Sequence, residues 1–537
     1  MKHFSSCPLA VLLALATVLA PLAAQTEPKR PLRPGQYKRV HQHALDLILA
    51  EKAQECIERL SAYVKEHGDD SESHFMLTLA HAHAGDLDKA EEHMKKAISL
   101  GLDPARFLAG PREIIKPLEK SGGFQKISYA LAKELIHGPM LGNLTHDSVS
   151  VWARAARENP ITLEIAPIDG AFTKSTEGKA SAANDFTVVV DHKADKLKPD
   201  TAYQYRIKAA DGEGLTGTFR TPPAPGSPTK FRVAFGGGSG FVPQNEHVWN
   251  TIGDEKPDLL ILLGDNIYSD DPETPEMQRY SYYRRQSRPE WRKLVATVPV
   301  YAIWDDHDFG KNDCIGGVEI NEPAWKPDVW KVFKENWVNP YYGGGKEQPG
   351  VWFDFMRGDV HFIMLDGRYY RSDQKHQPHP TMLGPAQLEW LEKTLKSSKG
   401  TFKVVLSPVP WVFGAKGNSK DTWNGFKEER KQIFDVIKDN KIEGVVLMSA
   451  DRHRSDAWKI EEDGLYPLYE FNSSRLTNQH VHGTMKNAIF SYNEKQSFGT
   501  VDFDTKADDP TVTYTVVSID GDKPHTLTVK RSELKFE

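Results

Sequence analysis

Hydrophobic and polar positions divide the chain into three stretches with different periodicity. Between 37 and 137 apolar residues recur every three or four positions, which is the spacing of amphipathic helices. Between 138 and 225 the pattern changes to alternation, with Val149, Val151 and Ala153 on one face, which predicts β-strands. From Lys230 onward short apolar runs alternate with helical stretches, which predicts an α/β fold. The chain is therefore expected to contain several domains.

The helical stretch contains two amphipathic segments on either side of Gly85-Asp86. This pair resembles a tetratricopeptide unit, and residues 44–64 have the pattern of a preceding unit. Stable arrays of such repeats usually contain three or more units, and a third is not apparent. Two interpretations remain open: a face that contacts a peptide or another protein, and a helical cap that packs on the rest of the chain.

The alternating stretch resembles a fibronectin III-like β-sandwich. Tyr203 and Tyr205 lie near the start of a predicted strand, where such sandwiches place a tyrosine that hydrogen-bonds back to the backbone. The proline-rich segment 222–228 then predicts a linker. We expect N-terminal α-helical hairpins in 25–137, the β-sandwich in 138–225 and an α/β domain in 226–537.

Residues 1–24 have the pattern of a signal peptide. Lys2 and His3 precede an apolar run from Leu9 to Leu19, and small residues follow before Gln25. The run is short for a bilayer span, which needs about 20 apolar residues, although an uncleaved anchor is the alternative. We expect an exported protein, periplasmic or extracellular, with no membrane span after cleavage. Cys56 and Cys314 would then remain as free thiols.

The charge of the chain argues against one class of partner. The formal net charge is -6, and Lys and Arg form no clustered run. Proteins that grip nucleic acid usually carry a basic face. Nucleic acid is therefore not expected as an obligatory partner.

Several predicted strands end in polar residues that can carry chemistry. In open α/β sheets ligands bind beyond the carboxyl ends of the strands, so such residues converge. A single Asp after a strand commonly caps the next helix, but converging carboxylates need protons or cations. Oxygen ligands suit hard divalent cations and imidazole suits transition metals. A mixed metal site is therefore indicated by the residues at these ends, which are Asp265, Asp305, Asp306, His307, Asp308, Asp366, Asp451 and His453.

The motifs at these ends resemble one known family. Gly264-Asp265-Asn266-Ile267-Tyr268, Trp304-Asp305-Asp306-His307-Asp308, Leu365-Asp366-Gly367-Arg368-Tyr369 and Ser449-Ala450-Asp451-Arg452-His453 occur in the order expected of PhoD-like alkaline phosphatases and phosphodiesterases, within the calcineurin-like metallophosphoesterases. The resemblance covers about residues 138–537. It implies a four-layer αββα catalytic domain with a polynuclear metal site between two sheets.

The resemblance also implies roles for individual residues. Asp265 would bridge metals, Tyr268 would be a phenolate ligand of ferric iron and Asp306 would bind a second metal. Asp451 and His453 would complete the metal ligands, and Asn312 would support a calcium-type site. His307 would act as general acid. Arg368 would either hold phosphate oxygens or form a salt bridge to a site carboxylate, and Asn266 and Tyr369 would contact substrate.

The sequence departs from the family pattern at one position. PhoD-like enzymes have a cysteine shortly after the first strand of the domain, resembling an iron ligand. Here that segment is Gly236-Gly237-Gly238-Ser239. Glu246 or His247 could substitute for the thiolate. Calcium with iron is the expected metal set, and zinc or manganese is the alternative.

The expected activity is hydrolysis of phosphate mono- or diesters by a metal-activated water, with His307 assisting the leaving oxygen. The substrate would be a small phosphate ester or a phosphorylated polymer, and the pH range neutral to alkaline. One alternative is a catalytically silent binding or docking protein on a phosphatase scaffold. Another is an esterase for a different anion, such as sulfate.

Overall fold

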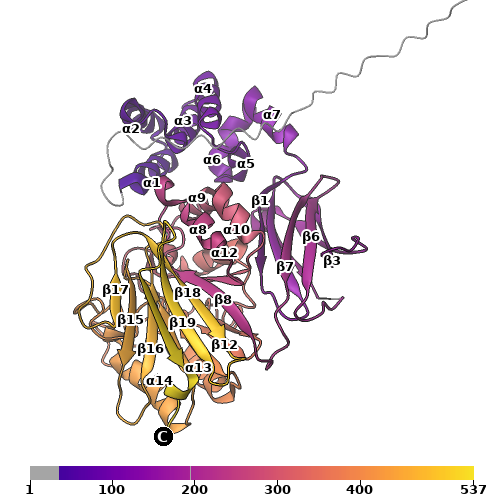
Figure 1. The fold of residues 1–537 in the computed structure, drawn as a ribbon. Coiled ribbons are helices and arrows are strands. Elements are labelled where there is room, and N and C mark those ends of the chain that lie inside the picture. The colour runs from indigo at the N-terminus through magenta and orange to yellow at the C-terminus, as the bar shows by residue number, and fades with distance from the viewer. Residues whose placement is uncertain (1–35, 194) are drawn as a thin grey trace, which may run out of the picture.

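The computed structural model describes residues 36–193 and 195–537, so the predicted signal peptide lies outside the described part (Figure 1). A helical segment comes first. Its α3 is the central helix, against which α1, α2 and α4 pack. Asp70 and Asp86 cap α3 and α4 by accepting hydrogen bonds from the backbone of Ser73 and Lys89. The elements of this segment are α1 (Gln36–Leu49), α2 (Ala53–Glu66), α3 (Ser71–His83), α4 (Leu87–Ser99), α5 (Arg106–Ala109), α6 (Arg112–Ile115), η1 (Lys116–Lys120) and α7 (Gly122–Ala130).

Two antiparallel sheets with their own hydrophobic core follow. One has the order β1-β2-β5 and the other β4-β3-β6-β7. The hydroxyl of Tyr203 accepts a hydrogen bond of 2.8 Å from the backbone N–H of Lys198, which ties the start of β6 to the preceding loop. The bounds are β1 (Leu135–Gly142), β2 (Val149–Ala155), β3 (Asn159–Pro167), β4 (Lys174–Ala180), η2 (Ala182–Asn184), β5 (Thr187–His192), β6 (Ala202–Ala209) and β7 (Leu215–Arg220).

The remaining chain builds two larger sheets rather than one. The six-stranded sheet has the order β10-β9-β8-β18-β19-β20, in which β8, β9 and β10 are parallel. The seven-stranded sheet has the order β11-β12-β13-β14-β16-β15-β17, in which β12, β13, β14 and β16 are parallel. The strands of the first sheet are β8 (Lys230–Gly236), β9 (Leu259–Leu263), β10 (Val300–Ile303), β18 (Ser497–Asp504), β19 (Thr511–Ser518) and β20 (His525–Lys530). Those of the second are β11 (Phe353–Arg357), β12 (Val360–Met364), β13 (Phe402–Leu406), β14 (Val445–Ser449), β15 (Ser455–Ile460), β16 (Leu468–Ser473) and β17 (Phe490–Tyr492).

The two sheets pack on each other through one continuous apolar core. Phe231 and Phe503 of the six-stranded sheet contact the ring of Phe362 in the seven-stranded sheet. The strands are almost wholly apolar because both faces are covered. The helices of this domain are α8 (Val248–Asp254), α9 (Pro275–Gln286), α10 (Pro289–Val295), α11 (Asp306–Phe309), α12 (Lys326–Asn336), α13 (Gly384–Ser397) and α14 (Lys427–Asp439), with the short turns η3 (Pro243–Asn245), η4 (Trp423–Gly425) and η5 (Arg531–Glu533).

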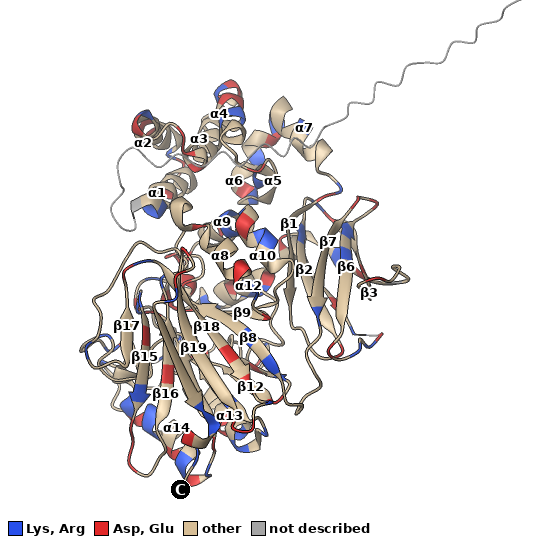
Figure 2. Cartoon of the chain, viewed as in Figure 1, with Lys and Arg blue, Asp and Glu red and all other residues tan. Residues whose placement is uncertain are grey.

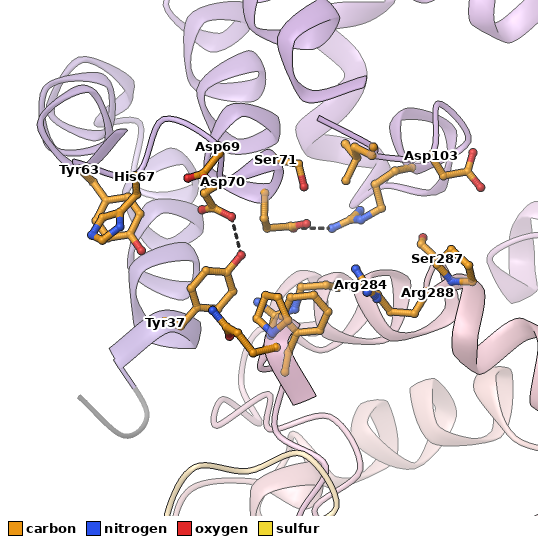
Figure 3. A pocket seen from close by; sticks show the side chains of 18 residues that line it. Tyr37, Tyr63, His67, Asp69, Asp70, Ser71, Asp103, Arg284, Ser287 and Arg288 are labelled. Atoms are coloured by element: carbon orange, nitrogen blue, oxygen red, sulfur yellow. Dashed lines mark hydrogen bonds and ion pairs between the residues drawn. The ribbon is translucent and has the colours of Figure 1, made fainter. Parts of the chain in front are cut away.

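The helical segment is packed on the catalytic domain and shares a core with it. Figure 1 shows it lying over α8 and α9. Met277, Tyr280 and Tyr283 of α9 belong to the apolar cluster of the helical segment. A cavity of about 90 Å³ remains at this boundary, with Tyr37 bonded to Asp70 on one side and Arg284 across from them (Figure 3). Of the two interpretations left open for this segment, this packing is that of a cap; a tetratricopeptide-like repeat remains a prediction.

Cys56 and Cys314 are both free thiols, as expected. Among the residues that the structure describes, no helix combines the length and apolar character needed to cross a membrane. Lys and Arg positions are interspersed with Asp and Glu positions on the face drawn in Figure 2. This distribution agrees with the absence of a basic run in the sequence.

Candidate active site

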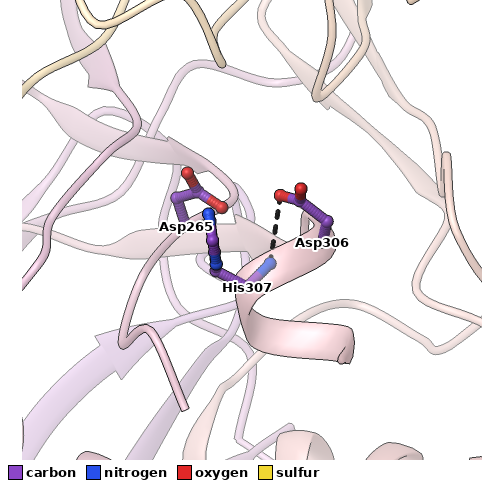
Figure 4. Close-up of side chains that lie close together, drawn as sticks. All are labelled: Asp265, Asp306 and His307. Atoms are coloured by element: carbon purple, nitrogen blue, oxygen red, sulfur yellow. Dashed lines mark hydrogen bonds between the residues drawn. The ribbon is translucent and has the colours of Figure 1, made fainter. Parts of the chain in front are cut away.

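The loops after β9 and β10 bring three predicted site residues together. Asp265 follows β9, and Asp306 and His307 form the start of α11 after β10. Each offers a ligand atom, and these atoms lie within 4.8 Å of one another (Figure 4). The backbone N–H of His307 also donates a 3.0 Å hydrogen bond to Oδ1 of Asp306. The parallel pairing of β9 with β10 explains the convergence, because their carboxyl ends meet at one edge of the sheet.

Asp308 has a different task from its neighbours. Its Oδ1 accepts hydrogen bonds from the backbone N–H groups of Asn266 and Ile267, at 2.7 and 2.9 Å. Its Oδ2 accepts from the side chain of Asn266 at 2.9 Å. The carboxylate thereby fixes the loop that carries Asp265, so Asp308 positions a ligand rather than offering one.

The backbone around the site is left-handed at several residues that are not glycine. Positive φ angles of 46° to 65° occur at Asp265, Tyr268, Asp270, Asp451 and His453. Such conformations are uncommon outside glycine, least so for Asp, and they cluster at functional sites where surrounding packing enforces them. The clustering of five such residues on the predicted ligand loops marks this region as the functional centre.

Tyr268 and His453 complete a second group of donors around Asp265. The phenol of Tyr268 donates to Oδ2 of Asp265 at 2.7 Å and lies 3.5 Å from Nε2 of His453. All three side chains are buried. Burial lowers the pKa of His453 well below its usual value, so its imidazole is neutral, the form in which histidine binds metals.

The electrostatics of this group fit a cation. Burial, together with the neighbouring carboxylates of Asp306, Asp305 and Asp308, raises the pKa of Asp265 well above its usual value, although the charge of His307 opposes the shift. Buried oxygen atoms without a hydrogen-bond partner here include Oδ1 of Asp265, Oδ1 of Asn266 and Oδ2 of Asp451. Buried polar groups are normally satisfied, so these donor atoms fit the metal ions that the resemblance implies.

A second carboxylate group, Asp306, Asp313 and Asp421, lies beside the first. Here positively charged side chains of the protein neutralise the carboxylates. Nζ of Lys416 lies 3.0 Å from Asp421 and 3.3 Å from Asp451, and Arg368 donates to both oxygens of Asp421. Asn312, expected at a calcium-type site, is exposed on the loop, whereas the backbone N–H of the next residue, Asp313, donates to Asp306 at 2.6 Å.

Two roles were open for Arg368, holding phosphate oxygens or forming a salt bridge to a site carboxylate. Its geometry is that of the salt bridge. Its side chain is wholly buried, and Nε donates to Asp305 at 2.6 Å while Nη1 donates to Asp421 at 2.7 Å. The guanidinium therefore spans two carboxylates instead of facing open space. Burial raises the pKa of Asp305, and the charge of Arg368 partly offsets this rise.

Two residues expected to contact substrate are buried and engaged elsewhere. Tyr369 is fully buried, stacks on Trp304 and donates its hydroxyl hydrogen to the carbonyl oxygen of Ile320. The amide of Asn266 donates to the carbonyl oxygen of Ile303 and to Asp308. The hydroxyl of Tyr369 is thus engaged within the fold, whereas Oδ1 of Asn266 has no hydrogen-bond partner; contact of either residue with substrate stays a prediction.

The two candidates for replacing the family's cysteine point away from the site. Glu246 is fully buried in an ion pair with Arg285 and accepts a hydrogen bond from Trp249. His247 is half exposed and faces Asp520 at 4.0 Å. The expectation that either substitutes for the thiolate is not met, because the turn η3 between β8 and α8 directs both side chains to other partners.

Two further histidines lie beside His453. A Cβ atom at Gly238 would lie 3.8 Å from Cε1 of His453, so this glycine faces the site. The rings of His480 and His482 lie 5.1 and 5.4 Å from the ring of His453. Their Nε2 atoms are 3.0 Å apart. Three imidazoles therefore gather on the Gly238 side of the site.

Several functional residues were missed because they lie outside strand ends. Asp270 accepts a short hydrogen bond from Nδ1 of His307 and forms a 2.7 Å ion pair with Lys38 of α1. The acidic run after Tyr268 was the available signal for Asp270. Asp313, Asp421 and Lys416 lie on irregular loops, and nothing in their local sequence marks them.

Comparison with known proteins agrees with this architecture. A family model described as PhoD-like phosphatase matches residues 233–515, and one described as the N-terminal domain of PhoD-like phosphatase matches residues 125–223. Alkaline phosphatase D of Bacillus subtilis (strain 168) is 26% identical over 410 residues, which are 65% of this chain and 68% of that protein. Purple acid phosphatase 23 of Arabidopsis thaliana is 23% identical over 244 residues, which are 41% of this chain and 45% of that protein.

Solved structures show the same fold. A structure of PhoD aligns with a TM-score of 0.62 and 20% identity, covering 73% of this chain and 88% of that one. A purple acid phosphatase from yellow lupin (Lupinus luteus) seeds aligns with a TM-score of 0.53 and 15% identity, covering 74% of this chain and 75% of that one. Since the first family model spans just over half of the residues, the chain belongs to the PhoD-like phosphatase family and is a metallophosphoesterase.

Proposed function

We propose that this protein is an exported phosphoesterase that hydrolyses phosphate mono- or diesters at neutral to alkaline pH. The observation that carries the proposal is the convergence of Asp265, Asp306 and His307 within 4.8 Å, beside buried donor atoms that lack partners. Export rests on the apolar N-terminal run, and the substrate is a small phosphate ester or a phosphorylated polymer. Low pH would protonate the carboxylates and release the metals, which favours the neutral to alkaline range.

Two groups of side chains would hold the metals. Asp265, Tyr268 and His453 supply oxygen and imidazole donors to one ion, and Asp265 with Asp306 and Asp451 supplies carboxylates to a second. Calcium with iron is the expected set. A site without thiolate also suits zinc or manganese, because these ions accept imidazole and carboxylate ligands.

We further propose that imidazole replaces the missing thiolate. His480 and His482 are the nearest groups of metal-binding chemistry to His453 on the side of Gly238. An imidazole nitrogen in place of sulfur would make the ligand set around the ion at Tyr268 harder, and imidazole suits zinc, copper and nickel as well as iron. Loss of one bound metal per chain in a His480→Ala, His482→Ala double variant, with His376→Ala as an exposed control, would support this assignment.

Bound metals would supply positive charge for the phosphoryl oxygens and lower the pKa of a water that serves as nucleophile. The chain's own residues would then handle the proton. Nδ1 of His307 is held by Asp270, so Nε2 faces Asp265 and Asp306 (Figure 4). Burial lowers the pKa of His307, but Asp265, Asp306 and Asp270 outweigh it and raise the pKa to about 10. With cations on Asp265 and Asp306, Asp270 is the carboxylate that still raises this pKa, so the contact with Asp270 would keep His307 protonated and able to give its Nε2 proton to the leaving oxygen.

The test is elemental analysis of the purified protein together with turnover of a phosphate monoester, a phosphate diester and a sulfate ester. Wild type should contain metal and hydrolyse at least one phosphate ester, and Asp265→Ala should lose both properties. Preference for the sulfate ester would move the proposal to another anion. A wild type that stays inert after calcium, iron, zinc and manganese are supplied would leave the docking role as the function of this scaffold.

A further inference from the structure

The helical segment reaches the active site through α1. Nζ of Lys38 forms a 2.7 Å ion pair with Oδ2 of Asp270, and both side chains are about nine-tenths buried. The same ammonium lies 4.1 Å above the ring centroid of Tyr268. Asp270 in turn accepts the hydrogen bond from Nδ1 of His307. A chain of contacts therefore runs from α1 to the imidazole that faces the metal ligands.

A second residue of α1 holds the same loop through its backbone. Nε2 of Gln42, one helical turn after Lys38, donates to the carbonyl oxygens of Tyr268 and Ser269 at 2.9 and 3.1 Å. Gln42 is buried as well. These two carbonyl groups lie in the loop in which Tyr268 and Asp270 have left-handed backbone conformations. The first turns of α1 thus satisfy two carbonyl groups of this strained loop.

The rest of α1 is anchored so that this contact is fixed. The hydroxyl of Tyr37 donates to Oδ1 of Asp70 at 2.5 Å (Figure 3), and Nε2 of His41 lies 3.1 Å from the other oxygen of that carboxylate. Asp70 caps α3, the central helix of the segment. Neither family model includes α1, since the matched residues begin at 125. The contact is therefore a feature of this chain rather than one that the family models describe.

We infer that Lys38 is a positioning residue of the phosphoesterase and that the helical segment is a working part of the active site. The inference rests on the proposed function. A buried ammonium is stable only beside a carboxylate, so Lys38 and Asp270 fix each other. The fixed carboxylate holds the Nδ1 proton of His307 and orients Nε2 toward the leaving oxygen, as partners of catalytic and metal-binding histidines do. Without Lys38, Asp270 keeps only the exposed guanidinium of Arg39, 4.0 Å away, so it can turn toward solvent with Arg39 and the imidazole loses its single orientation.

The experiment compares leaving groups in full-length protein. Two phosphate esters are used, one with a 4-nitrophenyl leaving group and one with an alkyl leaving group, because only the alkyl oxygen needs a proton as it departs. Lys38→Met should lower kcat for the alkyl ester about 10- to 100-fold, a share of what general acid catalysis contributes, and lower it much less for the nitrophenyl ester. KM and metal content should stay close to those of wild type, whereas Tm should fall, because the change removes the buried partner of Asp270. Lys38→Arg should restore most of the loss, because it keeps the positive charge.

Arg59→Met serves as the matched control, since Arg59 is an exposed cation of α2 paired only with Glu55. Equal losses for both esters, or no loss, would overturn the inference. Loss of metal from Lys38→Met would also overturn it, because Lys38 would then serve the metal ligands and not the imidazole. A failure of the proposed function is distinguishable, since wild type itself would then turn over neither ester.

Discussion

The phenol oxygen of Tyr268 lies 2.7 Å from Oδ2 of Asp265 and 3.5 Å from Nε2 of His453. These are the separations between neighbouring ligand atoms around a single ion, given metal–ligand distances of about 2.0 to 2.2 Å. Burial and the charge of Asp265 raise the pKa of Tyr268 well above its usual value, so the phenol keeps its proton until a cation displaces it. Metal binding and deprotonation of Tyr268 are therefore one event.

Replacing Tyr268 by Phe should remove one ligand and leave the ring packing intact. We expect metal affinity at this position to fall about 10- to 100-fold, as when a partner of a metal site is lost. If the metal is ferric iron, wild type should show a visible phenolate-to-iron absorption band that the variant lacks. Spectroscopy and metal analysis check this. A band that persists in Tyr268→Phe would show that another residue supplies the coloured ligand.

Replacing Arg368 by Met should destabilise the protein strongly. The change leaves the buried carboxylates of Asp305 and Asp421 without their shared guanidinium, and breaking a buried pair costs about 3–5 kcal/mol. Urea unfolding measures the loss, with Arg220→Met as the control because Arg220 forms an exposed pair with Asp200. If stability is kept while KM for phosphate esters rises, Arg368 holds substrate phosphate instead.

Removing the metals should change the sign of the effect that Asp265→Asn has on the free energy of unfolding. Chelation should lower the Tm of wild type, because bound ions stabilise only the folded state. In metal-free protein Asp265 is a buried carboxylate among others, so Asp265→Asn should raise the free energy of unfolding by about 1–3 kcal/mol relative to metal-free wild type. Unfolding of the four samples, with and without chelator, tests this. If metal-free Asp265→Asn is less stable than metal-free wild type, then burying Asp265 among other carboxylates does not destabilise the protein, and the prediction is wrong.

The docking of α1 should depend on pH through Asp70. Burial alone would raise the pKa of Asp70, but hydrogen bonds from His41, Ser73 and Tyr37 outweigh it and lower the pKa from 3.8 to about 2. A depressed pKa contributes stability that is present above pH 4 and is lost as pH falls toward 2. The contribution is about 2 kcal/mol at neutral pH.

Asp70→Asn measures that contribution directly. Its deficit in the free energy of unfolding should be full at pH 7 and should shrink between pH 4 and pH 3. Met94→Ala is the control variant, because it removes a buried apolar side chain of the same segment and no ionisable group, so its deficit should not depend on pH. A deficit that is the same at both ends of this range would mean that the charge of Asp70 does not stabilise the docked helix.

The central carboxylates could be predicted because a local rule applies to them. Asp265, Asp306 and His307 each follow a short apolar strand, and parallel strands bring their carboxyl ends to one edge. The presence of two sheets, however, was implied only by the family resemblance. The two tyrosines near the start of β6 also had a local signal, and the hydroxyl of Tyr203 does meet the backbone of Lys198.

The residues that surround this centre had no comparable signal. Asp421 and Lys416 lie on the long loop after β13, where no periodicity constrains a side chain. The choice between the two roles of Arg368 depended on Asp421, so it could not be made before the loop was placed. Lys38 is 232 residues away from Asp270 in the sequence, and only the docking of one domain on another joins them.

The left-handed backbone at the ligand loops limits how this site can be transferred. Each left-handed residue that is not glycine destabilises the folded chain by on the order of 1–2 kcal/mol. Here contacts such as those of Asp308 and Gln42 offset this destabilisation. A designer who copied only Asp265, Tyr268 and His453 onto another scaffold would obtain the right side chains on relaxed loops that aim them elsewhere. A design that keeps the site must transfer the loops together with the hydrogen bonds that support them. In this chain those hydrogen bonds include ones from α1, a helix outside the catalytic domain.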